Sequence, residues 1–187
     1  DWTTGHGVNP DTFPVVMQEW TETIDRDFNH PAIIGWCPLN ETPLSQNPEI
    51  VRALHRATRT LDPTRPAHDT SGYIHVETDI YDCHSYQQNP AVFARYFTPF
   101  RMGGEPFRNY PDIEVPYTGQ PYWVSEYGGI GWHAGENTPG AWGYGDRPRS
   151  KREFLDRYRA LTDVLLDHPR ISRFCYTQLY DVEQEVN

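Results

Sequence analysis

The sequence predicts an α/β fold in which strands and helices alternate around a parallel sheet. Apolar residues recur at helical spacing in three well-separated segments, and short apolar runs bounded by Pro, Gly or Asn lie between them. This alternation is typical of right-handed βαβ units, whose strands run parallel to one another. With 187 residues, the chain is long enough to bury a sizeable core in one domain.

Four helices are expected, and residues with capping or helix-breaking roles mark their ends. Their approximate ranges are 13–28, 48–61, 90–97 and 150–167. Asn47 precedes Pro48, which suits the first position of a helix, and Pro63 closes that helix. Ser150 and Glu153 form a capping box that opens the last helix.

Five short strands are expected between these helices. Their approximate ranges are 32–36, 65–69, 79–84, 122–125 and 172–179. The run 32–36 is apolar on both faces, as in a strand that is covered on each side. Two long connections, 99–120 and 128–148, are rich in Pro, Gly and aromatic residues, and loops of that length are usually functional or disordered.

These counts predict part of a closed barrel. A complete (β/α)8 TIM barrel needs roughly 250 residues, or about 31 for each strand–helix unit. A chain of 187 residues with two long loops therefore holds about five units. We expect one partial catalytic domain over residues 1–187, a C-terminal barrel fragment that contains about strands 4 to 8.

Charge and hydropathy exclude some classes of partner. The formal net charge is −10, which argues against nucleic acid and against anionic membrane surfaces, since both select positive patches. No apolar stretch approaches the roughly 18 residues of a membrane span, and no signal-peptide pattern is present. We expect a soluble protein, and the sequence does not choose between a cytoplasmic and a periplasmic or secreted location.

The three cysteines show no metal-binding or redox spacing. Cys37, Cys83 and Cys175 each lie in or beside an expected strand, without a CxxC or Cys/His motif. We expect buried thiols that form no disulfide. The histidines outside the candidate site likewise lack the spacing of a shared metal site, so no metal and no cofactor is predicted.

Two glutamates carry the most chemical information. Glu41 and Glu126 each follow an apolar run and precede a loop, which places a carboxylate at the C-terminal end of a strand. In a sheet of parallel strands these ends share one face, where catalytic groups from distant positions meet. Two carboxylates that meet in this way suit the hydrolysis of a glycosidic bond. The alternative is that both are solvated loop residues.

Three segments resemble glycoside hydrolase family 2, the β-galactosidase and β-glucuronidase family. Residues 29–36 (NHPAIIGW) with Asn40-Glu41 resemble its acid/base segment, and residues 125–128 (SEYG) resemble its nucleophile segment. Residues 176–187 (YTQLYDVEQEVN) are similar to the eighth-strand signature of one branch. The resemblance covers about residues 13 to 187. It implies that Glu41 ends the fourth barrel strand and Glu126 the seventh, with upstream sandwich domains and the first three strands absent.

The resemblance also implies roles for individual residues in a double-displacement mechanism. Glu126 would be the nucleophile and Glu41 the acid/base, while Asn40 would bind the 2-hydroxyl of the sugar. Tyr86 would contact the nucleophile. Further substrate-binding candidates are His84, Tyr176 as the floor beneath the sugar, and the loop residues Trp132, His133 and Trp142.

Three hypotheses for function follow. The first is a retaining β-glycosidase that hydrolyses terminal β-linked sugars, galactosidase- or glucuronidase-like, with a carbohydrate substrate. The second is a catalytically inactive half-barrel that at most binds carbohydrate and would self-associate through its open edges. The third is a more distant barrel glycosidase, such as a cellulase or mannanase, which explains residues 177–187 less well. Activity on nitrophenyl β-glycosides, set against a Glu126→Gln variant, separates the first two.

Overall fold

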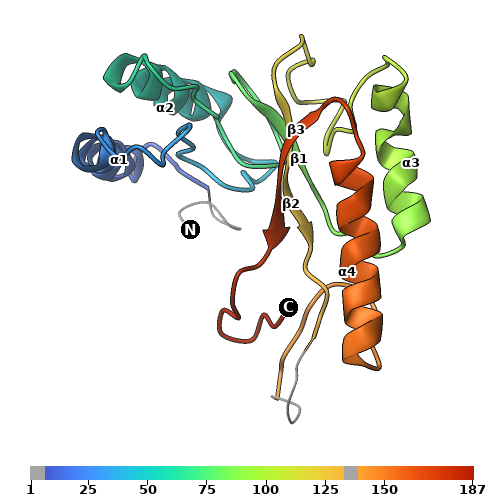
Figure 1. The fold of residues 1–187 in the computed structure, drawn as a ribbon. Helices are drawn as coiled ribbons and strands as arrows, with labels where there is room; N and C mark the ends of the chain where they lie inside the picture. The colour runs from blue at the N-terminus through green and yellow to red at the C-terminus, as the bar shows by residue number, and fades with distance from the viewer. Residues whose placement is uncertain (1–6, 133–138) are drawn as a thin grey trace. The chain divides into compact units, whose positions relative to one another are not determined.

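The computed structural model describes residues 7–132 and 139–187, which form four helices and three strands. The elements are α1 (Phe13–Asp27), α2 (Pro48–Leu61), β1 (Tyr81–Ser85), α3 (Pro90–Arg101), β2 (Tyr122–Gly128), α4 (Lys151–Leu166) and β3 (Ile171–Thr177) (Figure 1). The chain divides into two compact units. The first comprises residues 1–82 and 108–121, and the second residues 83–107 and 122–187.

The helices follow their predicted capping residues closely. The side chain of Asn47 accepts a hydrogen bond from the Glu49 N–H at the start of α2, and Ser150 accepts one from Glu153 at the start of α4. Helix α3 runs to Arg101, further than expected, because the buried Phe100 extends its apolar stripe by one turn. None of the described helices is both long and apolar enough to cross a membrane.

In the first unit, α1 and α2 pack against each other (Figure 1). Their shared core consists of Val8, Val16, Leu39, Ile50, Val51 and Leu54. The Trp20 indole N–H donates a hydrogen bond of 2.8 Å to the hydroxyl of Thr58, which fastens one helix to the other. Because Leu39 belongs to this core, the backbone two residues before Glu41 is anchored by apolar packing.

The two strands expected in the first unit do not form a continuous ladder. Segments 32–40 and 65–71 lie side by side but meet in isolated parallel bridges, Trp36 with Ala67 and Asn40 with Ser71. The prediction of regular strands at 32–36 and 65–69 is therefore wrong in detail. Pro38 and Pro66 interrupt the segments and have no N–H to donate, so neither can complete a ladder there.

Two histidines and two aspartates form a buried charge cluster in the first unit: His68, Asp69, His75 and Asp82. His75 lies between the carboxylates, with Nδ1 2.8 Å from Asp69 and Nε2 2.9 Å from Asp82. His68 Nε2 lies 3.0 Å from the same Asp82 oxygen. Burial alone would lower the pKa of His75, but the facing carboxylates outweigh it and raise that pKa to about 10. Burial opposes ionisation of Asp82, yet the imidazolium groups hold its pKa well below the usual range.

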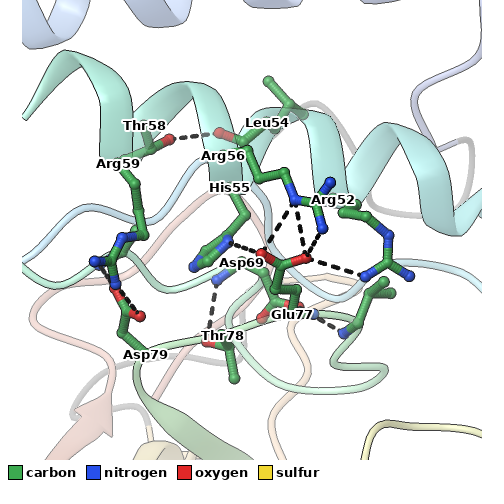
Figure 2. A network of polar contacts seen from close by, with 12 residues as sticks. Arg52, Leu54, His55, Arg56, Thr58, Arg59, Asp69, Glu77, Thr78 and Asp79 are labelled. Carbon is green, nitrogen blue, oxygen red and sulfur yellow. Dashed lines mark hydrogen bonds and ion pairs between the residues drawn. The ribbon is translucent and has the colours of Figure 1, made fainter.

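A second set of ion pairs joins α2 to the segment between His75 and Asp82. Arg52 and Arg56 both donate to the carboxylate of Glu77, and Arg59 donates to Asp79 (Figure 2). Glu77 is about one-third exposed, so these contacts orient the segment more than they stabilise it. The result is a defined path for the chain between His75 and Asp82, two members of the cluster.

In the second unit, one sheet carries the strands in the order β1-β2-β3, with β2 and β3 parallel. Helices α3 and α4 lie on the same side of these strands (Figure 1). Tyr127 of β2 joins both helices to the sheet: its ring lies 6.1 Å from that of Phe93 in α3, and its hydroxyl is 2.8 Å from that of Thr162 in α4. The helix-facing side of this sheet is thus a closely packed aromatic core.

The cysteines are less buried than expected. Cys83 in β1 is buried, whereas Cys37 and Cys175 are exposed. Cys175 lies on β3, which ends the strand order and pairs on one side only among the described strands. Cys37 lies in the irregular segment beside Pro38, where no continuous ladder covers it. The prediction of three buried thiols is therefore wrong for two of them.

We predict that the charge cluster makes stability fall as the pH rises. His75 has a folded pKa of about 10 against an ordinary value of 6.5, so its contribution is complete below pH 6.5 and is lost as the pH rises through 10. Between these limits the free energy of unfolding should drop by about 1.4 kcal/mol per pH unit for each histidine protonated only in the folded state. Urea unfolding at several pH values measures this slope. His75→Gln should reduce the slope by about 1.4 kcal/mol per pH unit, and an unchanged slope would contradict the assignment.

Candidate active site

Glu126 lies inside β2, at a bulge, rather than in a loop after the strand. The pairing with β3 runs from Val124 opposite Phe174 to Tyr127 opposite Tyr176, so β2 carries an extra residue at Ser125–Glu126. The bulge also explains why Tyr122 and Tyr127, five positions apart, both face α3. Without it, the period-2 alternation would point them in opposite directions. The adjacent Glu126 points away from the helices, with its side chain about 25% exposed.

Polar side chains from β1 and from the residue after it lie next to the Glu126 carboxylate. The phenol O–H of Tyr86, the residue directly after β1, donates to Glu126 Oε2. His84 of β1 places its Nδ1 3.4 Å from the same oxygen. The Tyr86 hydroxyl also lies 3.4 Å from the hydroxyl of Thr177 at the end of β3. Tyr86 and His84 were both predicted for the site from the sequence, and the structure brings both to Glu126.

The Tyr86 phenol is held in its protonated form. Burial raises its pKa, and the negative charge of Glu126 raises it further. The phenol therefore stays a donor over the whole physiological range. The hydrogen bond from this phenol therefore orients the Glu126 carboxylate.

Tyr144 is a further member of this site that the sequence did not reveal. Its ring stacks on that of Tyr86, with centroids 3.6 Å apart and planes within 5°. The Tyr144 N–H donates to the Gly129 carbonyl, and a Cβ on Gly129 would lie only 2.4 Å from the Tyr144 ring. The sequence signal is an aromatic residue between Gly143 and Gly145 in a long loop, which by itself indicates no role.

The loop tryptophans lie in different surroundings. Trp142 is about 47% exposed and its ring lies edge-on to Tyr144, with centroids 5.6 Å apart. It therefore continues the line of rings that begins at Tyr86. Trp132 instead packs against Phe154 at the start of α4, with centroids 5.7 Å apart. His133 lies outside the described residues.

Tyr176 is packed against β2 and α4 rather than beside Glu126. Its hydroxyl accepts a hydrogen bond of 3.1 Å from the Ile130 N–H, and its ring lies edge-on to Tyr127 and Tyr158. Burial raises its pKa to about 12. Along β3 the next residue, Thr177, reaches Tyr86 on the opposite side. This placement gives no support to the expected role of Tyr176 as the floor beneath a sugar.

Glu41 and Asn40 belong to the first unit, where Ser71 fixes their backbone. The Glu41 N–H donates to the Ser71 carbonyl and the Ser71 N–H donates to the Leu39 carbonyl, both at 2.9 Å. Glu41 has a φ of +46°, in the left-handed region that residues other than glycine rarely adopt. Such backbone conformations concentrate at functional sites, where the surrounding structure enforces them. Asn40 and Glu41 are both half-buried.

The charge cluster of the first unit also has the composition of a metal site. His68, Asp69 and His75 each offer a ligand atom within 4.8 Å of the others. Metal ions require neutral imidazole, however, and the carboxylates raise the pKa of both histidines. The geometry therefore favours paired charges at this position.

A carboxylate presented near the ends of parallel strands fits the active-site face of a barrel enzyme. The family model described as "Glycosyl hydrolases family 2, TIM barrel domain" matches residues 3–169, so the chain belongs to this family. The match confirms the expected partial (β/α)8 barrel and covers the segments at 29–41 and 125–128, whereas residues 176–187 lie beyond it.

Curated relatives are β-galactosidases. The enzyme BgaC of Bifidobacterium adolescentis is 32% identical over 81 residues, which are 42% of this chain and 7% of that protein. A β-galactosidase of Yersinia enterocolitica is 25% identical over 167 residues, covering 65% of this chain and 15% of the relative. The chain therefore spans only a small part of the relatives' length.

Solved structures agree on the fold. A β-galacturonidase from Eisenbergiella tayi has a TM-score of 0.67 at 18% identity, covering 90% of this chain and 30% of that one. A β-glucuronidase from Dictyoglomus thermophilum has a TM-score of 0.65 at 19% identity, covering 94% and 30%. At these identities the likeness establishes the fold alone.

We predict that the charge of Glu126 sets the titration of Tyr86. Glu126→Gln removes the nearby negative charge, so the pKa of Tyr86 should fall from its strongly raised value. The Cζ resonance of Tyr86 in a carbon-13 NMR titration measures this shift. Asp156→Asn, on the exposed face of α4, serves as the control and should leave Tyr86 unchanged. Equal titration of Tyr86 in both variants would refute the contact.

We also predict that Gly128→Ala disrupts the packing behind Glu126. Gly128 has a φ of +85°, and a Cβ there would lie 2.2 Å from the Tyr176 ring. The strained backbone and the clash together should lower the free energy of unfolding by about 2 to 5 kcal/mol. Gly140→Ala isolates the backbone part, because its φ is +78° and the nearest atom lies 3.8 Å away. Chemical denaturation compares the two variants, and equal losses would show that Tyr176 moves aside freely.

Proposed function

We propose that this chain carries the catalytic carboxylates of a retaining β-glycosidase that hydrolyses terminal β-linked sugars. The observation that supports this most is the Glu126 carboxylate, which accepts the Tyr86 O–H and faces His84. The phenol of Tyr86 and the imidazole of His84 can orient a nucleophilic carboxylate.

In this proposal Glu126 is the nucleophile. An oxygen of its carboxylate attacks the anomeric carbon as the bond to the leaving-group oxygen breaks, which forms a covalent glycosyl-enzyme. The Tyr86 O–H holds the carboxylate in position before the attack. Tyr144 acts as a positioning residue, because its stacked ring fixes the plane of Tyr86.

Glu41 is the acid/base of the proposed mechanism. It gives a proton to the leaving-group oxygen in the first step and accepts a proton from the attacking water in the second. The left-handed backbone at Glu41, tied to Ser71, supports a role that needs a fixed carboxyl. The proposal requires that Glu41 and Glu126, one from each unit, approach to about 5 to 5.5 Å.

The substrate class follows from the family and the neighbouring side chains. Asn40 would bind the sugar 2-hydroxyl, a contact that strengthens in the transition state. The exposed ring of Trp142, next to Tyr144, offers a flat surface for a pyranose. The relatives are called β-galactosidases, β-glucuronidases and a β-galacturonidase, so we propose a hexoside or hexuronide substrate.

A second candidate function rests on the exposed apolar surface of the second unit. Leu155, Leu166 and Leu179 are 48%, 63% and 91% exposed, near the strand that ends the sheet order. A 187-residue piece with such a surface would self-associate or pair with further barrel strands, and would be inactive alone. Gel filtration with a parallel activity assay separates this function from catalysis.

We predict different kinetic defects for variants of the two carboxylates. The assays should use the longest available protein that contains this sequence. Glu126→Gln should abolish hydrolysis of every nitrophenyl β-glycoside, because no covalent intermediate forms. Glu41→Ala should slow substrates with poor leaving groups by about 10² to 10⁴-fold. Nitrophenyl substrates, which need little protonation, should lose less in the first step.

Added azide provides the sharper test. It should restore turnover of Glu41→Ala by attacking the glycosyl-enzyme and yielding the β-glycosyl azide, since azide needs no general base. Asp156→Asn should behave as the unmodified protein. Full activity of Glu126→Gln, or an α-configured azide product, would contradict the retaining mechanism.

A further inference from the structure

The first unit contains a cavity of about 480 Å³ that the proposed hydrolysis does not use. Three chain segments line it: the stretch from Thr42 through the start of α2, residues 74–76, and residues 113–115. A hydrogen bond of 2.9 Å from the Val115 N–H to the His75 carbonyl joins the last two segments. The volume is within the range of small-molecule sites, which is roughly 300 to 1,000 Å³.

The cavity is polar at its base and apolar at its rim. Thr42, His75 and Glu114 are buried, with at most 5% of each residue exposed. Leu44 and Ile113 are 68% and 58% exposed and form the outer edge. An occupant that matches this arrangement has a polar head and an aliphatic body.

Two buried oxygen atoms of the lining have no hydrogen-bond partner among the described residues. They are Thr42 Oγ1 and Glu114 Oε2. The other oxygen of Glu114 accepts from the Tyr110 N–H at 3.3 Å. The neighbouring Tyr81 phenol, which interacts with the Glu114 side chain, donates its proton to the Val115 carbonyl at 2.7 Å and leaves Glu114 Oε2 unpaired. Buried polar atoms are nearly always paired, so these two indicate a missing partner within the cavity.

The charges around the cavity favour a neutral head group. His75 is already paired with Asp69 and Asp82, and Arg52 with Glu49 and Glu77. Burial raises the pKa of Glu114, and the nearby His75 and Arg108 cations oppose that shift only in part. A carboxylate ligand would be repelled by Glu114, and an ammonium ligand would be repelled by the His75 cation. A hydroxyl avoids both repulsions, since it accepts a hydrogen bond from Thr42 and donates one to Glu114.

The walls favour an aliphatic body over a sugar ring. The lining includes the aliphatic side chains of Val51, Ile74, Val76 and Val115, and Gln46, Pro48 and Arg52 complete it near the start of α2. No Phe, Tyr or Trp of the described residues belongs to it. Sugars are usually held by aromatic rings and many polar groups, whereas aliphatic walls hold alkyl chains. We propose that this cavity binds a small aliphatic alcohol, with its hydroxyl between Thr42 and Glu114 and its chain against the valine and isoleucine walls.

Titration with 1-hexanol, followed by amide NMR, tests the proposal. We expect saturable shifts at Thr42, Val76 and Val115, whereas hexylamine and hexanoate should bind at least about tenfold more weakly because their charges are not matched. Thr42→Val keeps the shape and removes the hydroxyl, so hexanol should bind about fivefold more weakly. Glu114→Gln retains an amide oxygen as acceptor and should preserve binding within about threefold, as expected if a hydrogen bond rather than charge holds the ligand.

Surface variants control for non-specific binding to apolar side chains. Ile113→Ser removes part of the rim and should weaken hexanol binding, while Leu166→Ser, at a similarly exposed leucine of α4, should not. Unchanged spectra of a folded protein on adding hexanol would overturn the proposal, because the two oxygens are then satisfied by water alone. Equal binding by Thr42→Val and the unmodified chain would overturn it as well. The measurement requires no catalysis, so its result is independent of the glycosidase proposal.

Discussion

The hydrogen bond from the Tyr86 phenol to the Glu126 carboxylate is the contact around which the second unit is organised. A charged carboxylate near the sheet needs a partner, since an unpaired one would be neutralised by a raised pKa. Tyr86 can meet that need only if its ring is held, and Tyr144 holds it by stacking. The Thr177 hydroxyl lies 3.4 Å from the same phenol oxygen. The site is therefore rigid because each polar contact is supported by a packed ring or a strand end.

In the first unit, an irregular backbone is held in place without a continuous β-ladder. Pro38 and Pro66 remove donors from the segments that lead to Glu41 and to the charge cluster. Instead, the packed side chain of Leu39 and the ion pair between His75 and Asp82 hold these segments in place. The strength of the ion pair depends on pH, whereas that of backbone hydrogen bonds does not. The left-handed conformation of Glu41 persists because this framework fixes its neighbours.

Sequence patterns predicted the helices and the site motifs better than the strands. Asn47 and Ser150 located helix starts because capping is a local interaction. His84, Tyr86 and Glu126 were predicted from the family resemblance, and the structure places them next to one another. Tyr144 was not found, because a stack between residues 58 positions apart leaves no periodic signal. The bulge at Glu126 was equally invisible, since it depends on the register with β3.

The contrast between Tyr176 and Thr177 shows how strand alternation distributes roles. The sequence drew attention to Tyr176, because an aromatic ring at that position would suit a sugar. The pleat of β3 instead turns Tyr176 toward Tyr158 of α4 and leaves the smaller Thr177 next to Tyr86. Gly128 permits this arrangement, since any side chain there would occupy the space of the Tyr176 ring. The aromatic residue thus supports the strand that carries Glu126, and in the proposed mechanism the exposed ring of Trp142 would offer a flat surface for the sugar.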